Sequence, residues 1–348
     1  MKTIRLYVVH NWIKNVDDFL KMFELHSLKD KFELIWDDIS PDFLFATDKI
    51  YHSKGEFNKF VKYYSKSKIN IFIASEAITP DFNIFDYAVG WDVDLKMGDR
   101  FALLPPATIY PSKGFLKTIV NDIKSVVEAK AELQKKTGFC NFLYSNWFAH
   151  PMRDKLFFEI SQYKHVDSLG KHLNNVSIKG TGYEGHRMEC VEIKRPYKFS
   201  IASENARFVG YTSEKLLTSL ASHTVPIYWG DPSVVQYFNP DTFINANEYS
   251  DMQSLIAKIQ EIDNDDNLWC KMISSPWQTE KQIEMCNKRL FNYIDFFVNI
   301  FNQELCDLKR APNGTMPYVY QNHFINGFEL PIKKYINLLV RKIKKFKK

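Results

Sequence analysis

The feature that most constrains the fold is an alternation of short, nearly continuous apolar runs with longer amphipathic runs. Apolar runs such as IRLYVV (4–9), INIFIAS (69–75) and KFSIAS (198–203) are rich in β-branched and aromatic residues. Between them lie segments such as EFNKFVKYYSKS (56–67), whose apolar residues recur at helical spacing. Strands that are apolar on both faces are typical of parallel sheets covered by helices. The sequence therefore predicts an α/β fold.

The alternation occurs twice. A polar stretch at 114–138, expected to form a long helix that ends at a glycine, separates the two series. We predict two Rossmann-like lobes with a cleft between them, followed by C-terminal helices. The expected divisions are an N-terminal lobe (1–136), a C-terminal lobe with a helical end (137–325) and a tail (326–348). In such sheets ligands bind at the carboxyl ends of the strands.

Charge and cysteine content exclude several classes of protein. The net charge is +5, but residues 333–348 carry eight Lys or Arg and no acid, which leaves −3 for the rest. A mildly acidic body argues against nucleic-acid binding. The five cysteines form no CxxC pair, which argues against a disulfide framework or zinc cluster and favours a reducing compartment. We expect neither a signal peptide nor a membrane span.

The C-terminal segment 331–348 has a pattern of its own. Its apolar residues fall at alternating four- and three-residue steps, which gives one apolar face among lysines: Ile332, Ile336, Leu339, Ile343 and Phe346. A basic amphipathic helix of this kind is typical of peripheral attachment to an anionic membrane surface. The alternatives are a solvated tail or a helix packed on the body.

The stretch SENARFVGYTSEKLLTS (203–219) gathers polar residues between a predicted strand and a predicted helix. Thr212 and Ser213 are candidate N-caps, which places Glu214 and Lys215 in the first helical turn. A helix N-terminus and a lysine suit a phosphate, a carboxylate can hold a sugar hydroxyl, and Tyr211 offers a flat ring. These residues suit an anionic, sugar-bearing ligand. The alternative is that the acids only complement the helix dipole.

Three longer segments resemble the α-1,3-fucosyltransferases of glycosyltransferase family 10. Residues 203–245 follow the order of the family's donor-binding signature, with the elements SEN, YTSEK, PIYWG and FNPDTFI. FCNFLYSNWFAHPMRDKLF (139–157) is similar to a family segment in which an arginine follows S-N, and IFIASEAITPDFNIFDYAVGWD (71–92) is similar to the acceptor-domain stretch. The departures are Ser203 where the family has phenylalanine, Thr212-Ser213 before Glu214-Lys215, the altered motif after Asp92, Asp241-Thr242, and wide divergence over residues 1–136.

The resemblance implies a GT-B-like enzyme that transfers L-fucose from GDP-β-L-fucose to a glycan hydroxyl with inversion. It implies that Glu76 is the general base and that Arg153 and Lys215 neutralise the diphosphate. The residues that it implies for the donor site are Ser145, Asn146, Arg153, Glu204, Asn205, Tyr211, Glu214 and Lys215. No cofactor or metal is implied. The alternative is a metal site at Asp92 and Asp94, because a D-x-D motif holds a divalent ion in glycosyltransferases of another fold.

The expected acceptor is GlcNAc or Glc of a lipopolysaccharide-type or lactosamine-type chain, with an α-1,3 linkage. The expected location is the cytoplasmic face of a bacterial membrane. Two alternatives stay open: a transferase for another GDP-activated sugar, and a non-catalytic, membrane-associated carbohydrate-binding protein.

Overall fold

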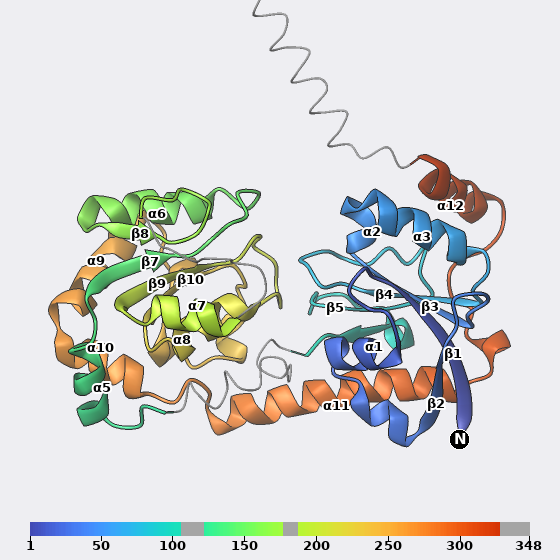
Figure 1. Cartoon of the computed structure of the whole chain (residues 1–348), viewed down its shortest axis with the longest axis horizontal. Coiled ribbons are helices and arrows are strands. Elements are labelled where there is room, and N and C mark those ends of the chain that lie inside the picture. The colour runs from blue at the N-terminus through green and yellow to red at the C-terminus, as the bar shows by residue number, and fades with distance from the viewer. Residues whose placement is uncertain (106–121, 177–186, 328–348) are drawn as a thin grey trace, which may run out of the picture. The chain divides into compact units, whose positions relative to one another are not determined.

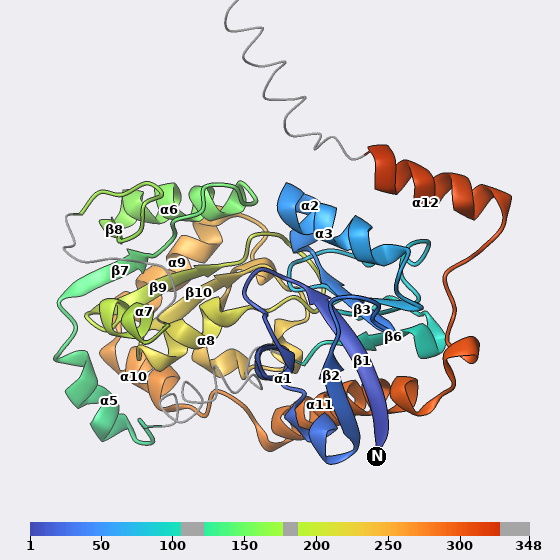
Figure 2. The same cartoon turned by 45° about the vertical axis from the view of Figure 1, so that its right-hand side comes forward.

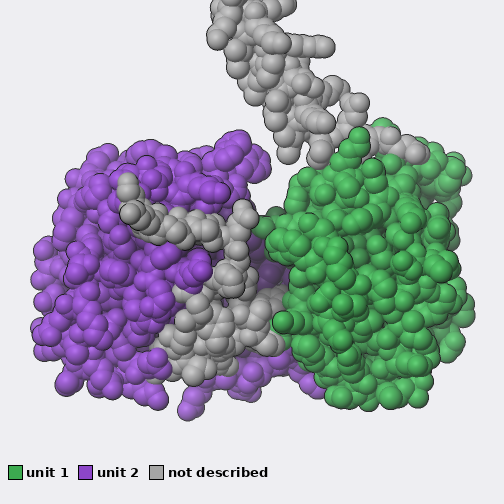
Figure 3. All heavy atoms as spheres, in the orientation of Figure 1, with its two compact units in different colours: residues 1–90, 95–103, 292–348 green, residues 91–94, 104–291 purple. Residues whose placement is uncertain are grey.

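The computed structural model describes residues 1–105, 122–176 and 187–327 of the chain (Figure 1). The chain forms two compact units, one of residues 1–90, 95–103 and 292–348 and one of residues 91–94 and 104–291 (Figure 3). Each unit is built around a parallel sheet with helices on both faces. This confirms the predicted pair of Rossmann-like lobes.

The sheet of the first unit has the strand order β2-β1-β3-β4-β5-β6, and each neighbouring pair is parallel. In Figure 2, β1 runs between β2 and β3. The strands are β1 (Lys2–Val9), β2 (Phe32–Trp36), β3 (Phe43–Thr47), β4 (Ile69–Ile73), β5 (Tyr87–Gly90) and β6 (Phe101–Leu103). Both β3 and β4 are buried along their whole length, as their continuous apolar sequences predict.

Helices cover both faces of this sheet. On one face, α2 (Lys49–His52) and α3 (Lys54–Tyr64) bury Ile50, Phe57 and Phe60. On the other face lie α1 (Val16–Phe23) and the C-terminal half of α11 (Glu280–Asn302). The aromatic rings of Phe19 and Phe297 contact Phe45 of β3 there. The apolar stripes of these helices therefore supply the two halves of the core.

The second unit has a five-stranded parallel sheet in the order β11-β10-β9-β7-β8. Its strands are β7 (Gly138–Phe142), β8 (Val166–Ser168), β9 (Tyr197–Ser203), β10 (Val225–Trp229) and β11 (Ile244–Asn245). Its helices are α5 (Val126–Leu133), α6 (Met152–Tyr163), α7 (Arg187–Lys194), α8 (Glu214–Ala221), α9 (Met252–Asn264), α10 (Asp266–Ser274) and the first part of α11.

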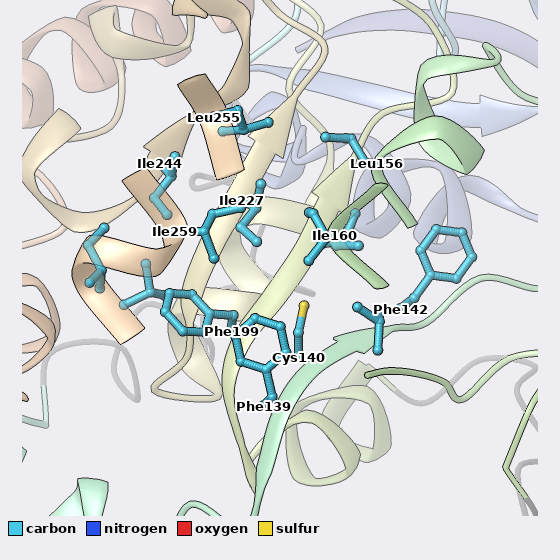
Figure 4. Close-up of a cluster of buried hydrophobic side chains, with 14 of the residues drawn as sticks. Phe139, Cys140, Phe142, Leu156, Ile160, Phe199, Ile227, Ile244, Leu255 and Ile259 are labelled. Atoms are coloured by element: carbon cyan, nitrogen blue, oxygen red, sulfur yellow. The ribbon is translucent and has the colours of Figure 1, made fainter. Parts of the chain in front are cut away.

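The larger core cluster of this unit lies on one face of the sheet. There, α6, α9 and α10 bury side chains such as Leu156, Ile160 and Ile259 against Phe199 and Ile227 of the strands (Figure 4). On the other face, α7 and α8 pack with the N-terminal part of α11. A sheet covered in this way leaves its strand ends, rather than its faces, for polar function.

The chain returns to the first unit after leaving it. The unit boundary falls within α11, and residues from Asn292 onward belong with the N-terminal sheet. Buried Asp86 fixes this return, because its carboxylate accepts the backbone N–H groups of Arg310 and Ala311 at 2.8 Å and the Lys309 ammonium at 3.0 Å. This division differs from the expected lobes of 1–136 and 137–325, because an apolar helix does not reveal from its sequence which sheet it covers.

Beyond this return, α12 (Thr315–Gly327) attaches to the first unit through Phe324. The Phe324 ring contacts the rings of Tyr51, Phe57 and Phe60 on α2 and α3. The expected basic tail, 331–348, lies outside the described residues. Among the described helices, none combines the length and apolar character that crossing a bilayer requires.

One local prediction was wrong. In the described part of the expected helix 114–138, only α5 is α-helical. Ser125 begins α5 by accepting the Glu128 N–H, and Gly138 already belongs to β7. A local cap and the start of a strand therefore override a continuous helical pattern.

The hydrogen bonds of Asp86 to residues 309–311 lead to a prediction about the stability of the fold. Replacing Asp86 with alanine leaves buried N–H groups without an acceptor, and we expect it to lower the free energy of unfolding by roughly 3 kcal/mol or more. Urea unfolding would measure this. The control is Asp99→Ala, which removes an exposed acid paired with Arg310 and should have little effect. Equal stability of the two variants would show that Asp86 does not hold the return.

Candidate functional site

The turn that follows β9 is built around the buried carboxylate of Glu204. Its Oε1 accepts the backbone N–H of Ser213 at 2.8 Å. Its Oε2 accepts the Ser213 hydroxyl at 2.7 Å and the Lys215 ammonium at 3.0 Å. Both oxygens of Glu204 are thus engaged by protein groups, which fixes the start of α8 against the end of β9. Of the two candidates, Ser213 is the N-cap residue, but its hydroxyl serves Glu204 rather than the helix amides.

Lys215 is held as a charged group in this arrangement. Its side chain is mostly buried, and its Nζ also lies 2.9 Å from the Ser213 hydroxyl and 4.0 Å from the Glu214 carboxylate. Burial lowers the pKa of Lys215, but the negative charges of Glu204 and Glu214 outweigh that effect and raise the pKa above its ordinary value. The lysine therefore keeps its proton at any physiological pH.

Two glycines make the close packing around this turn feasible. At Gly230, with φ of +150°, a β-carbon would lie 2.5 Å from Cγ of Glu204. At Gly210, with φ of +87°, a β-carbon would lie 2.1 Å from the carbonyl oxygen of Trp91. The ring of Tyr211, which follows Gly210, stands edge-on to Trp91 with centroids 5.5 Å apart. Residues with larger side chains at either glycine would displace the turn.

The loop that carries Gly210 is fixed by a second buried carboxylate, Asp231. Its Oδ1 accepts the Gly210 N–H at 2.8 Å and the Ser233 hydroxyl at 2.7 Å. Its Oδ2 accepts the Thr212 hydroxyl at 2.8 Å. Asp231 and Glu204 together immobilise the backbone from 210 to 215, so that the side chains of this segment are presented in a fixed arrangement.

Arg153 is the most deeply buried cation of the site, with only 1% of its surface exposed. It lies in the first turn of α6, and its guanidinium donates to the Asn205 side-chain oxygen at 2.5 Å and to the Ser203 carbonyl at 3.2 Å. Its Nη1 donates weakly to the Asn146 carbonyl at 3.4 Å. These partners are all neutral, and among the described residues no carboxylate forms an ion pair with it.

A buried guanidinium without a counter-charge is costly. Within the part of the chain that the structure describes, Nε of Arg153 has no hydrogen-bond partner either. The same holds for the buried hydroxyl oxygen of Ser145, eight residues earlier. Unsatisfied buried polar atoms are rare in proteins and indicate a ligand or water. The arrangement can therefore take up an anion.

Tyr144, at the end of β7, connects the two cations. Its ring stacks under the Arg153 guanidinium at 4.1 Å, and its hydroxyl accepts the Ser203 N–H at 2.6 Å. Burial raises the pKa of Tyr144 to about 12, against the lowering effect of the positive charges of Arg153 and Lys215. Tyr144 and Arg153 both donate to the carbonyl of Ser203, and the next residue, Glu204, holds Lys215, so the structure brings Arg153, Lys215, Glu204 and their turn together.

The remaining predicted donor residues surround this group. Asn205 joins the loop after β7 through its carbonyl, which accepts the His150 N–H at 2.8 Å. Asn146 shapes that loop by accepting the Phe148 N–H at 2.9 Å, and its side chain is exposed. Glu214 is partly exposed at the first turn of α8. The structure thus collects all eight predicted donor residues at the carboxyl ends of β7 and β9.

Glu76 lies at the corresponding edge of the first unit, just beyond β4, and is exposed. Buried Asp48 at the end of β3 organises its backbone. One oxygen of Asp48 accepts the Ser75 N–H and hydroxyl, each at 2.6 Å, and the Glu76 N–H at 3.1 Å. The Ser75–Glu76 backbone, which carries the predicted base, is therefore fixed to the end of the neighbouring strand β3.

The D-x-D pair forms a local turn. The Asp94 N–H donates to the Asp92 carboxylate at 3.1 Å. Among the described residues, no group of three or more His, Cys, Asp or Glu side chains is placed to hold a metal ion.

Sequence reasoning missed several residues that shape this site: Asp48, Tyr144, Gly230, Asp231 and Ser233. Asp48 and Asp231 had a usable signal, since each directly follows or nearly follows a buried strand. Tyr144 had none, because a tyrosine at the end of an apolar run is indistinguishable from a core residue. Its role depends on hydrogen bonds to a strand 57 to 59 residues further along the chain.

Two regions of the chain match protein-family models. Residues 133–316, more than half of the chain, match the model "Glycosyltransferase family 10 (fucosyltransferase) C-term". The chain belongs to glycosyltransferase family 10. Residues 9–110 of this family 10 chain match the model of the α-(1,3)-fucosyltransferase FucT N-terminal domain.

Two curated relatives are similar over part of their length. The α-(1,3)-fucosyltransferase FucT of Helicobacter pylori is 28% identical over 246 residues, which cover 63% of this chain and 49% of the relative. A putative fucosyltransferase (R654) of Acanthamoeba polyphaga mimivirus is 28% identical over 220 residues, covering 61% of this chain and 34% of the relative. The family 10 chain thus spans about half the length of these relatives or less.

The fold has a solved counterpart. A crystal structure of α1,3-fucosyltransferase superimposes with a TM-score of 0.66 at 22% identity, covering 90% of this chain and 93% of the other. The same enzyme with GDP gives a TM-score of 0.65 with the same coverage. At this identity, the likeness establishes the shared two-lobed fold of the family 10 chain.

Besides Lys215, the family 10 chain buries a second lysine against α8, the helix that follows the Glu204 turn. Lys194 of α7 is 5% exposed and donates to the hydroxyls of Thr218 and Ser219 on α8, at 3.0 and 3.1 Å. Among the described residues it has no carboxylate partner. Burial lowers its pKa from 10.5 to about 8. On folding, Lys194 therefore either keeps its positive charge in a buried place without a counter-charge or releases its proton to the solvent.

This lysine predicts a pH dependence of stability. Between pH 8 and 10.5 the unfolded chain binds more protons at Lys194 than the folded chain, so its contribution to stability rises with pH. Lys194→Met should therefore raise the free energy of unfolding at pH 7 by up to about 3 kcal/mol, and this gain should shrink toward pH 10. Denaturant titrations at several pH values would measure it. With the exposed Lys271→Met as control, a gain that is independent of pH would contradict the assignment.

Proposed function

We propose that this family 10 protein transfers L-fucose from GDP-β-L-fucose to a hydroxyl of an acceptor glycan, with inversion at the anomeric carbon. The proposal rests on family membership, on the names of its fucosyltransferase relatives, and on the chemistry of the site. The solved counterpart has been crystallised with GDP and with GDP-fucose, which supports a guanosine diphosphate donor here.

The single observation that carries the proposal is the uncompensated charge of Arg153. Lys215 is already balanced by Glu204, but Arg153 meets only neutral oxygens. A diphosphate would provide the missing negative charge, and a guanidinium fork matches phosphate oxygens in geometry. Lys215 adds a point charge beside it, so that the two cations would stabilise GDP as it leaves.

The proposed reaction assigns a task to each of these residues. The acceptor oxygen attacks C1 of fucose while the bond between C1 and the diphosphate oxygen breaks. The electron pair of that bond leaves with GDP, whose developing charge Arg153 and Lys215 stabilise. The proton of the acceptor hydroxyl passes to the carboxylate of Glu76, which acts as general base. Two fixed cations provide the neutralisation for which other glycosyltransferases use a divalent ion, so we propose that no metal is required.

The other predicted residues receive supporting roles. Glu214 would accept hydrogen bonds from sugar hydroxyls, and Asn205 and Tyr211 would line the donor pocket beside Ser145 and Asn146. Glu204 would act by holding Lys215. The proposed linkage is α-1,3, to GlcNAc or Glc of a lactosamine-type or lipopolysaccharide-type chain. Transfer of another GDP-activated sugar is the second candidate, because the diphosphate argument is the same for both.

Loss of the guanidinium should abolish tight donor binding. Arg153→Ala should weaken GDP binding at least about 30-fold, since removing one partner of a buried charge pair costs 2 kcal/mol or more. Isothermal titration calorimetry in EDTA would measure it, and thermal unfolding would verify the fold. The control is Lys155→Ala, an exposed cation two residues along the same helix. Undiminished GDP binding by Arg153→Ala would remove the basis of the proposal.

Loss of the base should separate chemistry from binding. Glu76→Gln should reduce turnover of GDP-fucose by roughly 10²- to 10⁴-fold while leaving GDP affinity unchanged. Initial rates would be measured with lactose, N-acetyllactosamine and type 1 chain acceptors, and GDP-mannose would replace GDP-fucose to test the second candidate. Asp81→Asn, in the same loop, is the control. Turnover that survives in Glu76→Gln would show that another group accepts the proton.

A further inference from the structure

Trp12 is an exposed tryptophan on a rigid turn. It lies in the loop between β1 and α1, and 69% of its surface is exposed. The residues on either side are anchored: His10 is buried and its carbonyl accepts the N–H of buried Ile13 at 3.2 Å. The Trp12 N–H itself donates to Nδ1 of His10 at 3.2 Å. The turn therefore holds the indole outward.

Neighbouring polar groups keep the indole in place. The His10 imidazole stands edge-on to it with centroids 5.6 Å apart, and the Lys49 ammonium lies 5.9 Å from its centroid. Lys49 begins α2 and directly follows Asp48, the residue that fixes the Ser75–Glu76 backbone. The indole and the predicted base are thus linked through the end of β3.

The sheet places the loops that carry Trp12 and Glu76 at the same edge, two strands apart. Trp12 follows β1 and Glu76 follows β4, and both strands pair with β3 in parallel. Their carboxyl ends are therefore about 10 Å apart, which is two inter-strand spacings. This spacing of the strand ends exceeds one pyranose ring, so an acceptor of two linked sugars has the length to span the loops that carry the two residues.

The surroundings favour a sugar over a lipid or a protein partner. Surfaces that bind lipids or proteins are contiguous apolar patches. Here a single ring stands among the polar side chains of Asn11, His10 and Lys49. A pyranose has one apolar C–H face and a polar rim, so it can stack on an indole while its hydroxyls reach donors and acceptors around it.

We propose that Trp12 is a platform for the acceptor glycan and that it stacks on the sugar adjacent to the one that receives fucose. The proposal rests on the proposed function, in which Glu76 activates the acceptor hydroxyl. It goes further by assigning a second acceptor subsite, which requires an acceptor of at least two sugars. Lys49 and His10 act as positioning residues for the indole.

The test compares acceptors of different length. With N-acetyllactosamine, Trp12→Ala should raise the acceptor KM about tenfold or more, and Trp12→Phe should restore most of the loss. With the methyl glycoside of GlcNAc, the KM, or the competitive inhibition constant where turnover is too slow, should be the same as for the unaltered protein. The GDP-fucose KM and the slow hydrolysis of GDP-fucose without acceptor should not change. Phe291→Ala, a similarly exposed aromatic, is the control.

Each outcome decides the matter. An unchanged disaccharide KM in Trp12→Ala overturns the platform, and equal losses for both acceptors overturn its assignment to the second sugar. A change in the GDP-fucose KM would place Trp12 with the donor and also overturn it. If the unaltered protein transfers no fucose, the proposed function fails separately. Quenching of tryptophan fluorescence by N-acetyllactosamine, absent in Trp12→Phe, would then still test the platform.

Discussion

The arrangement of the candidate site depends on one buried carboxylate. Glu204 holds the Ser213 backbone and hydroxyl and the Lys215 ammonium, and so joins the end of β9 to the start of α8. Its position is available only because residue 230 has no side chain. Strand, helix and glycine belong to three successive parts of the chain, and one carboxylate sets their relative positions. A buried charge of this kind is tolerated because its partners are complete.

The same carboxylate gives the two cations of the site different tasks. Lys215 and Glu204 form a nearly neutral pair, so that Lys215 offers hydrogen bonds and a partly screened charge. Arg153, with neutral oxygens as its partners, retains a full charge in a buried setting. The electrostatic attraction for an anion therefore originates mainly at α6. Lys215 is better suited to orient such a ligand than to attract it.

The sequence predicted the layers of the fold well, because strands buried on both faces leave continuous apolar runs. It also predicted which residues gather at the strand ends, since the carboxyl ends of parallel strands share one edge. It could not predict the partners of Glu204 or the neutral surroundings of Arg153, which depend on side-chain geometry across strands. Nor could it assign the second half of α11, because Phe297 and Phe301 could cover either sheet equally well. Three-residue strands such as β8 carry too few residues for a periodic signal.

The two units differ in how they hold their functional groups, and this difference has consequences for specificity. In the second unit, Arg153, Glu204 and Asp231 are buried at the strand ends, so a substitution there alters both the proposed ligand site and the packing around it. In the first unit, Glu76 and Trp12 are exposed on short loops whose anchors are Asp48 and His10. Exposed loop residues can be replaced at little cost to stability. If the proposed roles hold, substitutions at the donor residues affect the stability of the fold, whereas the residues proposed for the acceptor can change while the fold is preserved.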